Sequence, residues 1–471
     1  MVVIGETQKF KKLGETGFKQ AKFSDNYEYI IDSNGERVEF NDSRIVYIEP
    51  AARNRYGARL LERIYIEHGK KIRFADDIDP ETLQYARKIC SGRECLPTVA
   101  IAGAILKDVY ENRDKNEISI YRNPLEQEGP CQNGGWPALW DIFAQRLKIE
   151  NAIFHAAMGP EKNFMGLNLE FLLAQAFLYI LGHILTEAKN ALQCVAKNPD
   201  EALEMFEKIT DKFIENVKDL KKSIKLGLKE WAKEISKIQL RAKVEETPKI
   251  LIFGGLNLLF THYPFEEYFL NNGIIPKVVD LTEATRWVLY EFIMRYRFEK
   301  GKTSPKKQAS LFRLLFSLIF RKNRLDAKKA VFARLAMVIV DSNIRKYRKI
   351  IGKTKLLFDE DVSFKKLLKG CHQYVSCIAF TETLTTTGRF IQSIKSGYYD
   401  GLINLGSFNC QPAMNSQAII RPLANQSEMP YAAIDCEGPW ISSSHLRLLE
   451  TIAVQAKRFR KEKNKKTKIL S

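Results

Sequence analysis

The sequence of 471 residues lacks the local cysteine patterns of common metal sites. None of its eight cysteines has a second one at the C-x-x-C spacing of zinc ribbons and ferredoxins. The Gly254–Gly255 pair lacks the G-x-G-x-x-G spacing of a nucleotide loop, so we expect an ordinary tight turn there. Neither a zinc ribbon nor a dinucleotide-binding motif is indicated.

Long apolar runs are also missing. The N-terminal segment has no apolar stretch before a cleavage site, so we expect no secretory signal. The most apolar run, Leu167 to Leu185, is interrupted by Glu170, Gln175 and His183, which predicts a buried helix rather than a membrane span. Without a signal, the cysteines indicate reduced thiols or metal ligands rather than disulfides. We expect a cytoplasmic protein without a membrane-bound part.

Acidic residues are scarce in one segment. The net charge is +18, and residues 286–355 hold 20 Lys and Arg against 4 Asp and Glu. Aromatic residues lie among these basic residues: Phe312, Phe316, Phe320 and Tyr347. A solvated helical scaffold is our first interpretation of this segment, docking of an acidic protein or of CoA phosphates the second, and nucleic-acid binding the last.

Apolar periodicity predicts the fold class. Arg44 to Pro50 has the pattern of a buried strand, a helical pattern ends at Gly69, and a second strand pattern follows. The same strand–helix–strand succession begins again at PKILIFGG, residues 248–255. Such succession indicates right-handed parallel units. We therefore predict an α/β protein with two Rossmann-like lobes containing parallel sheets, a helical spacer and a basic helical insertion.

The expected organisation has five parts. These are a first α/β lobe (1–162), a helical spacer (163–247), a second α/β lobe (248–285 and 356–460), the basic helical insertion (286–355) and a basic tail (461–471).

Three cysteines stand at junctions that lead into helices. Cys95 and Cys410 each lie two residues before a proline that opens a helical pattern, and Cys131 lies between Pro130 and a glycine pair. Proline in a first helical turn loses no intrahelical hydrogen bond, and a helix N-terminus favours a negative group. We therefore expect thiolates here, which are ligands for soft metals and iron–sulfur clusters.

The other cysteines give weaker signals. Cys194 and Cys377 have the surroundings of buried apolar residues, and the same is expected of Cys371. Cys90 and Cys436 are alternative candidates for a fourth ligand. The acidic residues nearest to the cysteines, which are Glu94, Asp435 and Glu437, are candidates for proton transfer or for helix capping. From the residues alone, three unrelated core thiols and a structural zinc site both remain open.

The cysteine motifs resemble those of a known family. SGRECLP, EGPCQNGGWP and GYYDGLINLGSFNCQP, followed by IDCEG, resemble motifs of the 2-hydroxyacyl-CoA dehydratase and benzoyl-CoA reductase superfamily. The closest resemblance is to the dehydratase-like half of the acyl-CoA dehydratase activase-related proteins, also termed CoA-enzyme activase proteins. It covers residues 44 to 459 apart from the basic insertion, which is not a feature of the family.

The resemblance implies a redox function. A [4Fe-4S] cluster, or a double-cubane variant, would lie between the lobes with Cys95, Cys131 and Cys410 as ligands, leaving one iron open. A separate ATP-hydrolysing activase would supply low-potential electrons for radical dehydration or reduction, with an acyl-CoA as a possible substrate. The chain has no P-loop, so it should not hydrolyse ATP itself. A homo- or heterodimer is compatible with this function. The alternative is a non-catalytic basic protein that binds an acidic partner or nucleic acid, with structural cysteines or zinc.

Overall fold

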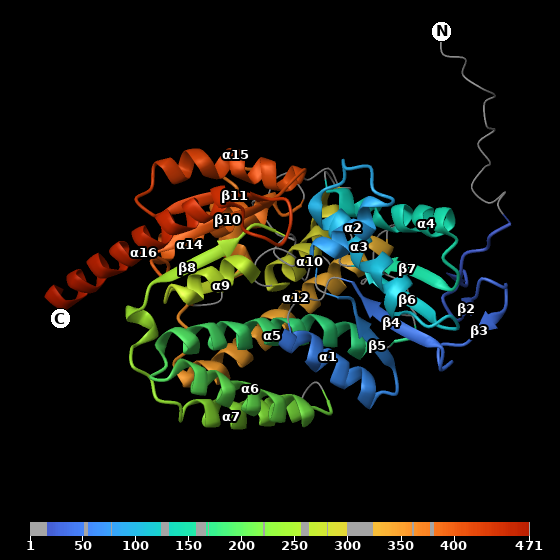
Figure 1. The fold of residues 1–471 in the computed structure, drawn as a ribbon, viewed down its shortest axis with the longest axis horizontal. Helices are drawn as coiled ribbons and strands as arrows, with labels where there is room; N and C mark the ends of the chain where they lie inside the picture. Colours follow the sequence, from blue (N-terminus) through green and yellow to red (C-terminus); the bar gives the residue numbers. More distant parts are fainter. Residues whose placement is uncertain are drawn as a thin grey trace, which may run out of the picture.

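The computed structural model describes residues 17–50, 55–76, 78–123, 131–156, 166–167, 169–219, 222–255, 263–279, 281–298, 324–359, 362–376 and 381–470. Within these residues, two four-stranded parallel sheets are each flanked by helices (Figure 1). The predicted fold class, an α/β protein with two Rossmann-like lobes, is confirmed.

The first sheet has the order β5-β4-β6-β7 with all neighbours parallel. Its strands are β4 (Ile45–Glu49), β5 (Lys71–Phe74), β6 (Ile118–Asn123) and β7 (Ala152–Ala156). Its helices are α1 (Arg55–Glu67), α2 (Pro80–Arg87), α3 (Leu96–Lys107) and α4 (Trp136–Leu147); a π-helical turn, Asp108–Asn112, follows α3. β4 is buried along its whole length, which explains its continuous apolar pattern. The strand order reverses between β4 and β6, and ligands of such sheets bind beyond the carboxyl ends of the strands at this point.

The second sheet repeats this design with the order β11-β10-β8-β9. Its strands are β8 (Lys249–Phe253), β9 (Ile275–Val278), β10 (Gly401–Ser407) and β11 (Tyr431–Cys436), and its helices are α9 (Tyr263–Asn271), α14 (Thr383–Ser396), α15 (Gln411–Asn425) and α16 (Ser443–Leu470). The order reverses between β8 and β10, so the Gly254–Gly255 pair and Cys410 both follow strands at the reversal point. Where the strand order of a parallel sheet reverses, the loops after the neighbouring strands leave a crevice, so candidate ligand residues are expected at these strand ends.

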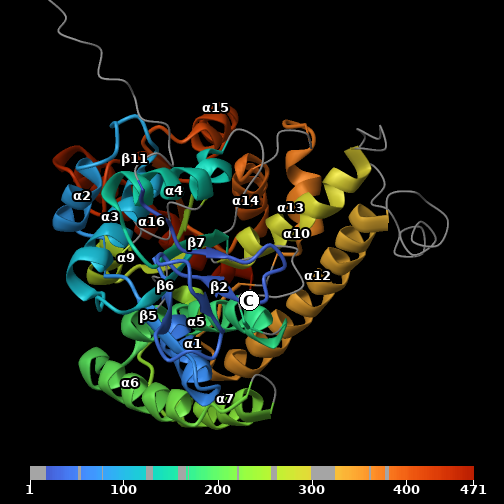
Figure 2. The same ribbon diagram turned by 90° about the vertical axis from the view of Figure 1, so that its right-hand side faces the viewer.

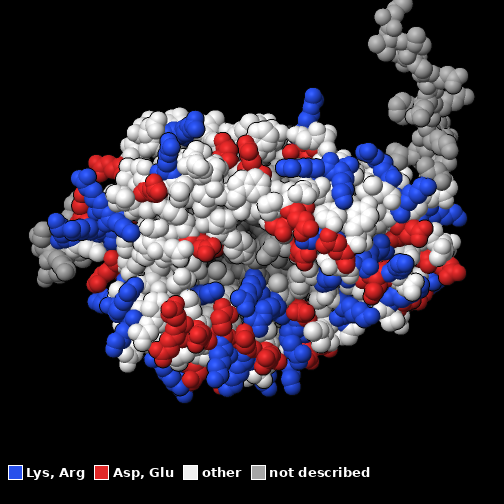
Figure 3. Space-filling model, in the orientation of Figure 1, with Lys and Arg blue, Asp and Glu red and all other residues white. Residues whose placement is uncertain are grey.

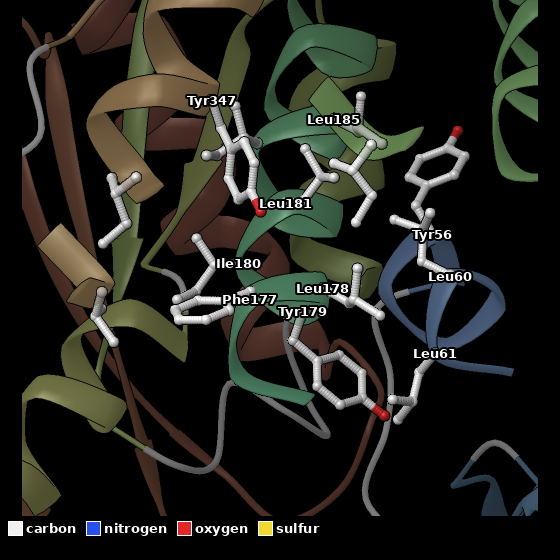
Figure 4. Close-up of a cluster of buried hydrophobic side chains, with 14 of the residues drawn as sticks. Tyr56, Leu60, Leu61, Phe177, Leu178, Tyr179, Ile180, Leu181, Leu185 and Tyr347 are labelled. Carbon is white, nitrogen blue, oxygen red and sulfur yellow. The ribbon is translucent and has the colours of Figure 1, made fainter. Parts of the chain in front are cut away.

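A layer of helices lies beside the two sheets. It consists of α5 (Leu169–Val195), α6 (Pro199–Glu215), α7 (Lys222–Ile235), α10 (Leu281–Phe298) and α12 (Arg324–Ile351), and α13 (Phe364–Cys371) leads back to α14. α5 contacts α1 of the first lobe and β9 of the second. Figure 4 shows α5 between α1 and Tyr347 of α12, with Leu181 and Leu185 among the side chains that fill the space. This core connects the helical layer to both lobes.

The basic insertion contributes to this layer. α10 and α12 pack side by side along one edge of the molecule (Figure 2), and α12 also contacts α5 and α7. Tyr347 is buried in the central core, whereas Phe312, Phe316 and Phe320 lie outside the described residues. Two basic residues of the insertion, Arg286 and Arg348, form ion pairs with Asp341 and Glu187. Part of the positive charge of the insertion is therefore used in ion pairs within the folded protein.

Short peripheral elements complete the fold. β1 (Lys22–Phe23), β2 (Ile30–Ile31) and β3 (Arg37–Val38) form a small antiparallel sheet, and single 3-10 turns lie at Gln132–Gly135, Val244–Glu246 and Gly352–Thr354. α16 projects beyond the second lobe, and Figure 3 shows Lys and Arg side chains along its projecting end. Among the described helices, none combines the length and the apolar character that a membrane crossing needs.

Candidate functional site

Cys95 is held at the start of α3 by a short loop. The Glu94 carboxylate accepts hydrogen bonds from the backbone N–H groups of Ser91 (3.0 Å), Gly92 (3.0 Å) and Arg93 (3.1 Å), which fixes the turn before the cysteine. Glu94 therefore has a structural role as a cap. Cys95 is the N-cap of α3, and the Thr98 hydroxyl lies 3.2 Å from its Sγ.

Cys131 is attached to the same region through its neighbour. Gln132 accepts a hydrogen bond from the Cys95 backbone N–H through Oε1 (2.9 Å). The Trp136 indole N–H donates to the Thr98 hydroxyl (2.8 Å), and this hydroxyl also contacts the Cys95 sulfur. Cys131 is the N-cap of the 3-10 turn that leads into α4. The starts of α3 and α4 are thus connected directly.

Cys410 comes from the second lobe. It is the N-cap of α15, immediately after β10, and Asn409 makes the tight turn with a left-handed φ of 58°. The Cys410 N–H donates to the Ser407 carbonyl (3.1 Å). Gly254 lies so close to β10 that an added Cβ would be 1.9 Å from the Leu405 carbonyl oxygen. Glycine is therefore required at the end of β8.

The two lobes meet beside these cysteines. The Leu96 N–H donates to the Phe408 carbonyl (3.3 Å), although Leu96 belongs to α3 and Phe408 follows β10. The Leu96 side chain, 6% exposed, packs into the apolar core of the second sheet with Ile250 and Leu405. Because Leu96 follows Cys95 and Phe408 precedes Cys410 by two residues, this contact brings two of the thiols together across the lobe boundary.

Electrostatic coupling shows that all three thiols share one site. Burial raises the pKa of Cys131 far above its usual value, and the charges of Glu382, Cys410 and Cys95 raise it further. Burial, then Glu382 and Cys95, raise the pKa of Cys410 to about 12. The pKa of Cys95 is also raised, first by burial, with Glu382 contributing. The structure thus brings together the three cysteines that the sequence singles out.

The expectation that these cysteines are thiolates by themselves is wrong. Each is at a helix N-terminus, as predicted, but burial raises all three pKa values. An apolar environment disfavours the charged sulfur more than the helix N-terminus favours it. A metal bound at these sulfurs would remove their protons, because a metal deprotonates its thiol ligands.

Glu382 is a site residue that the sequence does not reveal. It is 6% exposed and stands immediately before α14, and its carboxylate contributes to the raised pKa of every one of the three thiols. An added Cβ on Gly255 would lie 3.3 Å from its Oε2, so the carboxylate lies against the glycine turn after β8. Glu382 lies outside all three cysteine motifs, so the sequence signals that identify the cysteines do not identify it.

The remaining cysteines occupy other environments. Cys194 and Cys371 are buried in the central core, as expected, and Cys377 lies outside the described residues. Cys436 is fully buried in the core of the second sheet. Burial and the charge of Glu94 raise the pKa of Cys90 to about 12, and Cys90 packs on the apolar core of the first lobe. Asp435 accepts a hydrogen bond from Gln417 (2.8 Å), which indicates a structural role.

The donor set fits an iron–sulfur cluster. Three soft sulfur atoms converge from three helix starts. The hydroxyl of Ser407, whose carbonyl accepts the Cys410 N–H, is buried without a hydrogen-bond partner. In the described part of the chain, no three His, Cys, Asp or Glu side chains are arranged around a single metal ion.

The fold and the site define a two-lobed α/β protein with a three-cysteine site at the lobe boundary. Comparison with known proteins adds no assignment, since no protein-family model and no curated protein matches the chain.

Proposed function

We propose that the protein is an iron–sulfur redox protein that holds a [4Fe-4S] cluster, or a double-cubane variant, through Cys95, Cys131 and Cys410. The observation that carries this proposal is the convergence of three thiols from two lobes, of which Cys95 is buried and Cys131 and Cys410 are half-buried. The resemblance of the three cysteine motifs to the 2-hydroxyacyl-CoA dehydratase and benzoyl-CoA reductase superfamily supports the same assignment. The bound cluster would supply low-potential electron transfer and, at an iron without a cysteine ligand, Lewis acidity.

The protein's own residues would hold the cluster and shield it. The Thr98 hydroxyl, 3.2 Å from the Cys95 Sγ, would donate a hydrogen bond to a cluster-bound thiolate and so stabilise negative charge on the sulfur. Leu96, packed into the second sheet, excludes water from one side of the site. Glu382 places a carboxylate next to the thiols. A dry site of this kind strengthens every electrostatic interaction within it.

The partners follow from the same proposal. A separate ATP-hydrolysing activase would deliver electrons, and an acyl-CoA is the substrate class that the resemblance suggests, in dehydration or reduction. We also propose that the protein is cytoplasmic, where cysteines stay reduced.

The purified chain should not hydrolyse ATP, and ATP-dependent reduction of its cluster should require a second protein fraction. ATP-dependent reduction by the chain alone would contradict this part of the proposal.

Iron analysis tests the cluster assignment. Protein purified without oxygen should be brown and contain about four iron per chain for one cubane. Cys410→Ser should lose most of that iron, because the substitution removes one of three thiolates. Cys194→Ser is the matched control, since Cys194 is a buried thiol in the central core.

Three results would contradict the assignment. These are colourless protein without iron, undiminished iron in Cys410→Ser, and one zinc per chain without visible absorption. The last result would favour a structural zinc protein.

A further inference from the structure

We propose that Trp136 is a positioning residue that acts through the Thr98 hydroxyl on the sulfur of Cys95 and thereby makes the bound cluster easier to reduce. Thr98 donates the hydrogen bond to the sulfur, and the Trp136 indole holds the hydroxyl in the orientation that allows it. This inference rests on the proposed function, because it requires a cluster at the site. It adds the residues that adjust the reduction potential of that cluster.

The contacts of Thr98 are the first argument. Its hydroxyl oxygen lies 3.2 Å from the Cys95 Sγ and 2.8 Å from the Trp136 indole nitrogen. An indole N–H can only donate a hydrogen bond, and a thiolate, which has no proton, can only accept one. Once Cys95 is a thiolate, the hydroxyl therefore accepts from Trp136 and points its own hydrogen at the sulfur.

The start of α3 explains why the hydroxyl reaches the sulfur. Cys95 is the N-cap of α3 and Thr98 is the third helical residue, so their side chains lie on the same side of the first turn. In a capping box, the third side chain bonds to the backbone N–H of the N-cap residue. Here Gln132 Oε1 already accepts that N–H (2.9 Å). The Thr98 hydroxyl is therefore available to the sulfur rather than to the backbone.

Burial increases the effect of this hydrogen-bond chain. Cys95, Thr98 and Trp136 are 6%, 1% and 2% exposed, and Trp136 belongs to the apolar core of the first lobe. In a low-dielectric site a hydrogen bond acts more strongly on charge than in water, and successive bonds in a chain strengthen one another. Hydrogen bonds to the sulfurs of a cluster help to set its reduction potential. A donor at Cys95 stabilises the reduced cluster more than the oxidised one, because the reduced cluster is more negative.

A second Trp–Thr pair makes the same contact in a structural setting. The Trp231 indole N–H donates to the Thr210 hydroxyl (2.9 Å), which joins α7 to α6, and both residues are buried. Neither helix contains a cysteine. The pair at α3 differs because its hydroxyl also contacts a sulfur. The α6–α7 pair therefore supplies a control for loss of the Trp–Thr contact itself.

Potentiometry of the cluster-loaded protein tests the role of Thr98. Thr98→Val should lower the ratio of reduced to oxidised cluster at a fixed potential about tenfold, which is about 59 mV for one electron, because the reduced cluster loses a donor. Thr98→Ser should keep the wild-type potential, since it keeps the hydroxyl. Thr210→Val is the matched control: it removes the Trp231 contact and should leave the potential unchanged.

A double-variant cycle separates the positioning role of Trp136 from a packing role. Trp136→Phe keeps a buried ring but removes the N–H, so the potential should fall by less than in Thr98→Val. The double variant should fall no further than Thr98→Val alone, because Trp136 acts only through Thr98, whereas independent effects would add. Trp140→Phe is the control. Trp140 lies on the same helix, is 1% exposed, and its indole N–H has no acceptor among the described residues.

Two results on loaded protein overturn the inference. These are a wild-type potential in a Thr98→Val protein with full iron content, and additive effects in the cycle. Where Thr98→Val takes up no iron, Trp136→Phe decides the question, and an unchanged potential there overturns the inference. All of these results leave the cluster itself in place. Iron-free wild type instead overturns the proposed function, and the inference with it.

Discussion

At the scale of single residues, the buried charges of the first lobe show how burial sets ionisation. Glu49, the last residue of β4, pairs with Arg122 of β6 (3.0 Å), and the Arg122 side chain is fully buried. Burial raises the pKa of Glu49 from 4.5 to about 7, against the effect of Arg122. Near neutral pH, a substantial fraction of Glu49 is therefore protonated.

This shift predicts how stability depends on pH. The folded-state pKa of Glu49 is above the unfolded one, so the folded protein binds the extra proton between pH 4.5 and about 7. The free energy of unfolding should fall by about 3 kcal/mol as pH rises through that window. Glu49→Gln should flatten this dependence, as measured by urea unfolding at several pH values. An unchanged pH profile in the variant would refute the assignment.

At the scale of elements, α2 and α3 pack closely because a glycine lies at their contact. Gly103 lies in the middle of α3, where an added Cβ would be 2.2 Å from the Thr82 carbonyl oxygen of α2. Cys95 is the N-cap of the same helix, α3. The distance between α2 and α3 is thus set by a glycine that helix propensity alone would disfavour.

Gly103→Ala should therefore destabilise the protein. The backbone oxygen of Thr82 cannot move without its helix, so the clash should outweigh the gain in propensity of about 1 kcal/mol and leave a net loss of about 1–2 kcal/mol. Thermal unfolding followed by circular dichroism measures it. Gly352→Ala is the control, because nothing lies within 4 Å of its added Cβ. A stabilised Gly103→Ala protein would show that α2 and α3 can separate freely.

At the scale of the whole molecule, a buried ion network joins the helical layer to the second lobe. Asp359 contacts Lys277 of β9 (2.5 Å) and Arg348 of α12 (2.7 Å), and both cations also contact Glu187 of α5 (3.2 and 2.8 Å). The Tyr399 hydroxyl donates to Asp359 (2.7 Å) just before β10. Although burial opposes ionisation, Lys277 and Arg348 lower the pKa of Asp359.

Asp359→Asn should weaken this junction strongly. The substitution removes a negative charge that Lys277 and Arg348 both contact. Breaking a buried ion pair in this way lowers the free energy of unfolding by about 3–5 kcal/mol. Urea unfolding at neutral pH measures the loss. Glu462→Gln is the control, because its ion pair with Arg458 is exposed and should matter little. If Asp359→Asn and Glu462→Gln had equal free energies of unfolding, the ion network would not stabilise the contact between the helical layer and the second lobe.

The fold is largely predictable from the sequence because its strands are apolar runs and its helices have amphipathic spacing. The junctions at Cys95 and Cys410 are also predictable, since proline in a first turn is a local signal. Glu382 is not predictable, because its approach to the thiols depends on how α14 packs. The raised pKa values of the three thiols are not predictable from the sequence either. They result from burial, which is a property of the folded chain, whereas the helix N-terminus that favours a thiolate is encoded locally.

The contact between Leu96 and Phe408 ties access to the three-cysteine site to the lobe boundary. The segments that present Cys95 and Cys410 are the same ones that fasten the lobes to each other. Separating the lobes to admit metal must therefore also pull two of the three sulfurs apart. On the proposed function, cluster assembly and lobe closure become a single event, so uptake of iron by the apoprotein should proceed at the rate of lobe opening and be independent of iron concentration at saturation.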